Sequence, residues 1–144
     1  MLQVEIESDQ VPRPRILVVD DEDFVRDALS RFLSIRGFDV DQARDGLEAV
    51  QKCAEHDYDL VTMDLEMPKL VGREAIERIR RVHRALPIVV LTGFTQLLDG
   101  KPFPDISGLL TKPVSLWKIE AEIRKHIEPS GTGLPPNPTI GSPQ

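Results

Sequence analysis

Short apolar runs alternate along the chain with segments in which apolar residues recur at helical spacing. Short runs rich in Val, Ile and Leu are typical of buried strands, whereas an apolar residue at every third or fourth position is typical of a helix with one buried face. Strands that alternate with helices predict right-handed crossovers and a parallel sheet that is covered on both faces. The pattern therefore predicts a doubly wound α/β fold with five parallel strands, at 16–19, 38–41, 60–63, 88–91 and 109–110.

Residues that favour helix ends mark the boundaries of the helical segments. Gly37 is placed for a left-handed C-cap, Asp45 with Glu48 resembles a capping box, and Ser115 is a candidate N-cap. Glycine and proline residues after the fourth strand leave room for only a short fourth helix, around 95–98. The apolar faces of the four longer helices are expected to consist of Val25, Ala28, Leu29, Phe32 and Leu33; Leu47, Val50 and Ala54; Ala75, Ile76, Ile79 and Val82; and Leu116, Ile119, Ile123 and Ile127.

The two ends of the chain lack this pattern. Residues 1–14 are acidic and end in prolines, which favours a loose N-terminal extension over an extra edge strand or a dimer arm. Residues 128–144 are rich in Pro, Gly, Ser and Thr with little to bury, and we expect a disordered tail or a linker there. A single domain is therefore predicted at residues 15–127.

The composition narrows the classes of partner. The 144 residues include 18 Lys and Arg against 24 Asp and Glu, a net charge of −6, which argues against direct binding to nucleic acid. No apolar stretch approaches the roughly 20 residues that a membrane-spanning helix needs. The single cysteine, Cys53, falls on the apolar side of a predicted helix and is expected to be a small buried residue. We expect a soluble protein of the reducing cytoplasm with no membrane partner.

Polar side chains stand where four of the apolar runs stop. Asp20 and Asp21 follow the first run, Asp64 the third, Thr92 the fourth, and Lys112 comes just after the last. In open parallel sheets, ligands bind outside the carboxyl ends of the strands, where the strand order reverses. These five residues are therefore expected to meet in one cleft.

Three carboxylates in one cleft need a cation. At about 4 Å and an effective dielectric constant near 20, two unit charges repel by roughly 4 kcal/mol. Because every candidate ligand is a hard oxygen, we expect Mg²⁺ or a similar ion such as Mn²⁺. Thr92 and Lys112 would then suit the oxygens of a phosphoryl group, with Asp64 as the nucleophile that forms an acyl phosphate. Helix capping alone explains isolated acids but not this combination.

The segments at 18–22, 63–68, 91–93 and 111–113, in this order, resemble a response-regulator receiver domain of two-component signalling over residues 15–127. The resemblance implies a flavodoxin-like (βα)5 fold, here with a shortened fourth helix. It also implies a module that is not an enzyme, since it catalyses only its own phosphorylation and dephosphorylation. Its partners would be a sensor histidine kinase or a phosphotransfer protein, and a downstream protein target that the sequence does not identify.

The resemblance also assigns roles to single residues. Asp64 would accept the phosphoryl group from a phosphohistidine. Mg²⁺ would be held by Asp21, Asp64 and the backbone carbonyl of Glu66, with Asp20 acting mainly through water. The phosphoryl oxygens would be contacted by two side chains, those of Thr92 and Lys112.

Several positions depart from the family or vary within it. The aromatic residue usually found three positions before the lysine is Leu109 here, so an aromatic switch is not expected. Because the fourth helix is shortened, a standard dimer is not expected either, and the oligomeric state is left open. Glu66 and Phe94 occupy two variable positions that flank the phosphoryl site, and bulky Phe94 is a candidate screen against the attacking water. The resemblance also implies that the Lys112–Pro113 peptide bond is cis.

Two other functions would use the same residues. A phosphohydrolase of the haloacid dehalogenase type places its nucleophile on the first strand with a second Asp two residues later, whereas Asp64 is expected on the third strand and is followed by Glu66. A receiver that signals without phosphorylation, as a scaffold, is less favoured because all five polar positions are filled. We therefore interpret the chain as a stand-alone receiver, although a piece of a longer regulator would carry the same pattern.

Overall fold

The computed structural model describes residues 12–66, 72–93 and 105–127. Strands and helices alternate along these ranges, as the apolar pattern predicts. The expected short helix around 95–98, and nearly all of the two terminal segments, lie outside the described residues. The elements are β1 (Arg15–Val19), α2 (Asp23–Ile35), β2 (Asp39–Ala43), α3 (Gly46–Glu55), β3 (Leu60–Asp64), α4 (Gly72–Val82), β4 (Ile88–Thr92), β5 (Gly108–Thr111) and α5 (Leu116–Ile127).

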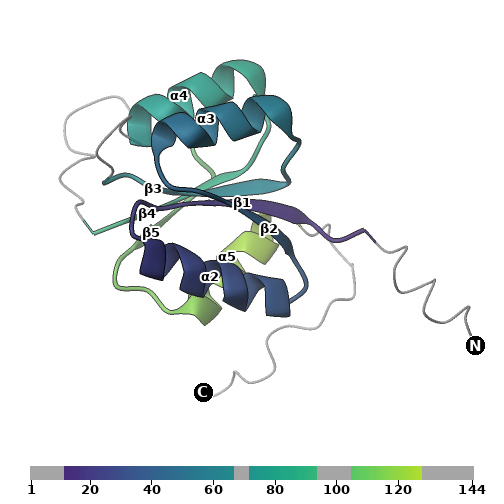
Figure 1. Cartoon of the computed structure of the whole chain (residues 1–144), viewed down its shortest axis with the longest axis vertical. Coiled ribbons are helices and arrows are strands. Elements are labelled where there is room, and N and C mark those ends of the chain that lie inside the picture. The colour runs from purple at the N-terminus through teal and green to yellow at the C-terminus, as the bar shows by residue number, and fades with distance from the viewer. Residues whose placement is uncertain (1–11, 67–71, 94–104, 128–144) are drawn as a thin grey trace, which may run out of the picture.

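The five strands form one parallel sheet in the order β2-β1-β3-β4-β5. The chain crosses from β1 to β2 on one side and then returns to β3 on the other side of β1, so the strand order reverses between β1 and β3. Helices α3 and α4 cover one face of the sheet, and α2 and α5 cover the other (Figure 1). This confirms the predicted doubly wound arrangement. None of the helices in the described ranges has the length and apolar character needed to cross a membrane.

The sheet separates two apolar clusters that are built from alternating strand residues. In β1, Leu17 and Val19 belong to the cluster under α3 and α4, whereas Ile16 and Val18 belong to the cluster under α2 and α5. All residues of β3 and β4 are buried, as expected for strands covered on both faces. Cys53 lies in the first cluster, where burial raises the pKa of its thiol to about 11. The prediction of a small buried cysteine is therefore confirmed.

Parts of the predicted helix faces are wrong. Leu47 and Val82 are 53% and 71% exposed, and Ala54 is also exposed. Val82 is the last residue of α4, and the buried face of that helix stops one turn earlier, at Ile79. Of the residues predicted for α3, Val50 packs against the core, but Leu47 and Ala54 do not, because small side chains supply the rest of the contact and let the helix pack closely. The buried residues of α3 are Gly46, Ala49 and Cys53.

The predicted face of α2 is covered only in part. Leu29 and Leu33 are buried, but Val25 and Ala28, which lie closer to the start of the helix, are exposed. These two residues line a cavity of about 610 Å³, to which Leu116 of α5 also contributes. The first half of α2 therefore does not close against α5.

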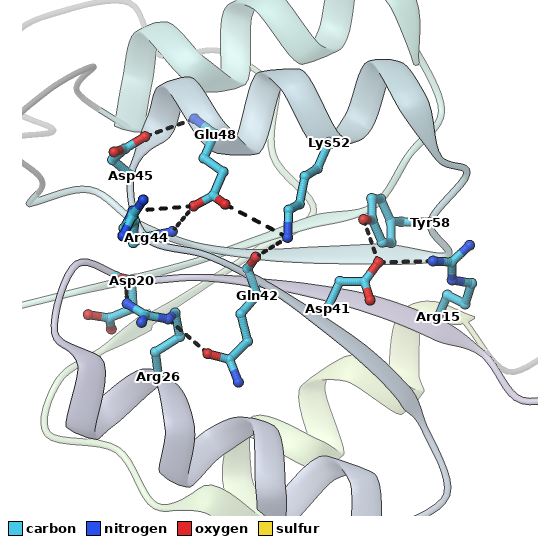
Figure 2. Close-up of polar contacts among 10 residues, drawn as sticks. All are labelled: Arg15, Asp20, Arg26, Asp41, Gln42, Arg44, Asp45, Glu48, Lys52 and Tyr58. Atoms are coloured by element: carbon cyan, nitrogen blue, oxygen red, sulfur yellow. Dashed lines mark hydrogen bonds and ion pairs between the residues drawn. The ribbon is translucent and has the colours of Figure 1, made fainter.

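The predicted caps at Gly37, Asp45 and Ser115 are confirmed, but the side chain of Glu48 accepts from the N–H of Arg44 at 2.8 Å and not from that of Asp45, so the capping box is formed only in part. Gly37 has a φ of 107°, a left-handed conformation that glycine adopts without strain. The N–H of Glu48 donates a hydrogen bond to Oδ1 of Asp45 at 2.8 Å (Figure 2). The N–H of Lys118 donates to Oγ of Ser115 at 3.0 Å. These caps set where α3 and α5 begin after the strands that precede them.

Candidate functional site

The predicted polar residues lie together at the carboxyl ends of the strands. Asp64 and Thr92 are the last residues of the neighbouring strands β3 and β4, while Asp20 and Lys112 directly follow β1 and β5. Asp20, Asp64 and Thr92 are 4%, 3% and 0% exposed, whereas Asp21 is exposed. The point at which the strand order reverses, between β1 and β3, therefore coincides with a buried acid from each of these strands.

Three carboxylates lie close enough to share a cation. One oxygen from each of Asp20, Asp21 and Asp64 lies within 4.8 Å of the others. All are hard oxygen donors, and Mg²⁺ is typically bound through a few carboxylates while it keeps part of its water shell. The donor set and the exposed position of Asp21 fit this mode of binding. The ligand assigned to the backbone carbonyl of Glu66 stays a prediction.

Lys112 places an ammonium beside the two buried acids. Its Nζ lies 3.4 Å from Oδ2 of Asp20 and 3.7 Å from Oδ2 of Asp64. Burial acts to lower the pKa of Lys112, but the two carboxylates outweigh it and the net shift is upward. Burial raises the pKa of Asp64 to about 6, although the N–H of Glu66 and the charge of Lys112 act to lower it. The carboxylate of Asp64 is therefore costly to ionise in its buried place, which is consistent with a site that takes up a further cation.

Asp20 and Asp64 share a local arrangement that orients their carboxylates. Oδ1 of Asp20 accepts a hydrogen bond from the N–H of Glu22 at 2.9 Å, and Oδ1 of Asp64 accepts one from the N–H of Glu66 at 3.0 Å. In each case the donor lies two residues further on, as is common for Asp in turns. The other oxygen of each carboxylate, Oδ2, is the one closest to Lys112. Local turn chemistry therefore aims both acids at the same ammonium.

Arg26 holds the backbone that carries Asp20 (Figure 2). Its Nη1 donates to the carbonyl of Asp20 at 2.8 Å, its Nε to Oε1 of Gln42 at 2.9 Å, and its Nη2 to Oδ1 of Asp23 at 2.6 Å. The N–H of Asp20 also donates to the carbonyl of Ala43 at 3.1 Å, so the backbone of Asp20 is held on both sides. The role of Arg26 was not predicted from the sequence, because Arg26 is one of many charged residues there.

The side chain of Glu66 also belongs to the site, which the sequence interpretation missed. Oε2 of Glu66 accepts a hydrogen bond from Oγ1 of Thr92 at 2.8 Å and a second one from the N–H of Gly93 at 2.8 Å. The sequence interpretation used only the backbone carbonyl of Glu66 and its place among the variable positions. The contact could have been predicted from two features of the sequence: Glu66 follows the candidate nucleophile Asp64 by two residues, and the next predicted strand ends in the hydroxyl of Thr92.

A profile of the response regulator receiver domain matches residues 16–124. The chain belongs to this family. Receiver domains act as phosphoacceptors in two-component signalling and bind Mg²⁺ at an acidic pocket. They are generally signalling domains rather than enzymes.

The receiver is similar to several known members of the family. It is 38% identical over 112 residues to response regulator MprA of Mycobacterium sp. (strain KMS), a match that covers 76% of this chain and 49% of MprA. The chain thus spans about half the length of the curated relatives it matches. Response regulator TrrA of Thermotoga maritima, solved in complex with Mg²⁺-BeF, is 31% identical with a TM-score of 0.72, over 78% of this chain and 97% of TrrA. A Burkholderia pseudomallei response regulator solved with a phosphorylated aspartic acid is 26% identical with a TM-score of 0.65, over 76% of this chain and 66% of that one.

Three expectations that follow from comparing the sequence with the receiver family have different outcomes in the structure. Leu109, at the position where the resemblance leads one to expect an aromatic residue, lies in β5 and is 41% exposed. The Lys112–Pro113 peptide bond is cis, as the resemblance implies. Phe94 lies outside the described residues, so its role as a screen against water stays a prediction.

Replacing Gly72 by alanine is expected to lower the free energy of unfolding of the receiver by about 1–2 kcal/mol. A Cβ at this position would lie 2.8 Å from the carbonyl oxygen of Asp64 and 2.8 Å from Cα of Leu65. Because both are backbone atoms, the start of α4 must shift, and this overpacking outweighs the helix propensity of alanine, about 1 kcal/mol at most.

Urea unfolding of the Gly72→Ala receiver measures this loss. Gly93→Ala is the matched control, because the atoms nearest to its added Cβ would lie 3.8 and 3.9 Å away, at ordinary contact distance. Equal stability of the two variants would contradict the predicted clash at Gly72.

Proposed function

We propose that the receiver is a binding module controlled by phosphorylation of Asp64. The phosphoryl donor would be a phosphohistidine of a sensor histidine kinase or of a phosphotransfer protein. The observation that carries this proposal is the buried carboxylate of Asp64, with the ammonium of Lys112 at 3.7 Å and oxygens of Asp20 and Asp21 within 4.8 Å. A buried acid whose pKa is raised to about 6 does not favour the folded state, and such groups gather at functional sites.

Phosphoryl transfer to Asp64 forms one bond and breaks another. A carboxylate oxygen attacks phosphorus, the bond between phosphorus and the donor nitrogen breaks, and its electron pair stays on the imidazole. Lys112 would stabilise the negative charge on the phosphoryl oxygens, and the hydroxyl of Thr92 would donate a hydrogen bond to one of them. Both groups are already held at the same edge of the sheet as Asp64.

The three clustered acids Asp20, Asp21 and Asp64 would form the metal site. Asp21, Asp64 and the backbone carbonyl of Glu66 would hold Mg²⁺, and Asp20 would act mainly through water. When bound, Mg²⁺ neutralises part of the negative charge of the carboxylates and of the phosphoryl oxygens. The complex of TrrA with Mg²⁺-BeF supports a Mg²⁺ site in this chain by similarity, and the phosphorylated aspartic acid in the Burkholderia pseudomallei protein supports an aspartate as the phosphoacceptor.

The output of the module would be a changed surface presented to a protein target. Family membership favours this function over a phosphohydrolase of the haloacid dehalogenase type.

We propose residues 15–127 as the receiver domain, with 1–14 as an extension and 128–144 as a tail. Neither nucleic acid nor a membrane is proposed as a direct partner, and the cytoplasmic location expected from the composition stays a prediction.

Intact mass after incubation with acetyl phosphate and Mg²⁺ tests the proposal. The wild type is expected to gain one phosphoryl group, and this gain should disappear in Asp64→Asn or when a chelator removes Mg²⁺. Asp57→Asn is the matched control, because Asp57 is exposed and should leave the gain unchanged. Phosphorylation that persists in Asp64→Asn would overturn the assignment. No gain in the wild type would favour the scaffold function, and turnover of free phosphomonoesters would favour the phosphohydrolase.

A further inference from the structure

We propose that the carboxylate of Glu66 occupies the place of a phosphoryl oxygen in the unphosphorylated receiver and must leave it when Asp64 is phosphorylated. Glu66 would therefore act as an internal gate on the phosphoacceptor. This inference rests on the proposed function, because it assigns the neighbouring donors to a phosphoryl group on Asp64.

The contacts of Glu66 are those of an anion in an oxyanion site. A single oxygen, Oε2, receives both the hydroxyl of Thr92 and the backbone N–H of Gly93, each at 2.8 Å. Thr92 is fully buried at the end of β4, so its hydroxyl is directed by the fold. Two converging donors of this kind, one of them a backbone N–H, are the arrangement that stabilises an anionic oxygen.

The same two donors border the space beside Asp64. Thr92 ends the strand that pairs with the strand of Asp64, and its carbonyl accepts a hydrogen bond from the N–H of Lys112 at 2.9 Å. A Cβ built on Gly93 would lie 3.9 Å from Cβ of Lys112. The Nζ of Lys112 in turn lies 3.7 Å from Oδ2 of Asp64. A phosphoryl group on Asp64 would thus lie between Lys112 and the donors that Glu66 now holds.

Glu66 and a phosphoryl group cannot hold these donors together. Both are anionic, and like charges that compete for the same two donors repel each other. The carboxylate must therefore turn away as the phosphoryl group arrives. In the unphosphorylated receiver, Glu66 keeps the donors of Thr92 and Gly93 arranged for an anionic oxygen, but it also opposes phosphorylation. Once displaced, its carboxylate changes the charge near the site.

Three variants in Mg²⁺ test this gate. Glu66→Ala removes the competing anion, Glu66→Gln keeps an acceptor oxygen without the charge, and Glu22→Gln removes an equal charge from an exposed side chain near Asp20. Beryllofluoride, titrated while the amide resonance of Gly93 is followed by NMR, serves as the phosphoryl probe. We expect beryllofluoride to bind about tenfold more tightly to Glu66→Ala, which corresponds to the contribution of one charge-assisted hydrogen bond. The gain in affinity should be smaller in Glu66→Gln and less than about twofold in Glu22→Gln.

The outcomes separate this inference from the proposed function. In the free protein, the Gly93 resonance should shift on Glu66→Ala, and the rate of phosphorylation by acetyl phosphate should rise in the same variant. Beryllofluoride affinity that is unchanged or weaker in Glu66→Ala would overturn the gate even if Asp64 is phosphorylated normally, as would an equal gain in Glu22→Gln. Failure of every variant to accept a phosphoryl group, with the beryllofluoride gain intact, would instead overturn the proposed function.

Discussion

Replacing Glu120 by alanine is expected to lower the free energy of unfolding of the receiver by about 3 kcal/mol, because it leaves two guanidinium groups without their shared carboxylate. The side chain of Glu120 is 3% exposed and joins α5 to the end of α2. Nε of Arg36 lies 2.9 and 3.0 Å from its two oxygens, and Nε of Arg124 donates to Oε2 at 2.8 Å. Removing one partner from a buried ionic group costs far more than a surface ion pair contributes.

The two arginines have further contacts within the receiver, so their charges stay in place when the carboxylate is removed. Nη2 of Arg124 donates to the carbonyl of Arg36 at 2.9 Å. The guanidinium of Arg36 lies 4.9 Å from the ring centroid of Trp117, and that of Arg124 lies 4.7 Å from the centroid of Phe38. Their side chains are 27% and 21% exposed, which admits some water and places the expected loss at the lower end of the range for buried pairs.

Urea unfolding monitored by circular dichroism measures the effect of Glu120→Ala. Glu120→Gln keeps the shape and one acceptor oxygen and should lose about half as much. Glu55→Ala is the matched control, since Glu55 is an exposed glutamate in α3 and its loss is expected to stay within about 0.5 kcal/mol. A Glu120→Ala receiver as stable as Glu55→Ala would show that the ionic group does not hold α2 to α5.

The metal-free receiver should become more stable at neutral pH when Asp64 is replaced by asparagine, by about 2–3 kcal/mol. Burial raises the pKa of Asp64 to about 6, against the opposing effects of the Glu66 N–H and Lys112. An aspartate in an unfolded chain has a pKa of about 3.9. Between these values the folded state binds a proton that the unfolded state has released, so the free energy of unfolding falls as the pH rises through this window. Asparagine does not ionise and avoids the loss.

Unfolding of the wild type and of Asp64→Asn in a chelator, at a series of pH values from 4 to 8, measures the difference in their free energies of unfolding. We expect this difference to develop between about pH 4 and 6. The two proteins should be closest in stability at the acid end and furthest apart above the pKa of Asp64. Saturating Mg²⁺ should reduce the gap or reverse it, because an ion that binds only the folded state stabilises it. Asp57→Asn controls for the removal of an exposed acid. A stability difference that does not change with pH would contradict a raised pKa at Asp64.

The strands and the candidate site could be predicted from the sequence to a large extent. A strand buried on both faces is typically a nearly continuous apolar run. The ends of β1, β3 and β4 could therefore be predicted directly, and with them the polar residues at these ends. The helix faces could be predicted less well. Leu47 is exposed in α3 while Ala49 is buried, because close packing against a neighbouring helix selects small side chains that a hydrophobic pattern ranks low.

The sequence by itself determined the α/β class, the positions of the strands and the set of polar residues at their carboxyl ends, because apolar runs and helical spacing are local properties of the chain. Only the tertiary structure decided that Glu66 binds the donors of Thr92 and Gly93, 26 and 27 residues away, and that Glu120 pairs with Arg36, 84 residues away. The chain contains 24 acidic residues, and each could meet many donors. For the buried acids Glu120 and Asp64, the packing of the strands and helices selects the partners, because burial makes an unpaired charge costly.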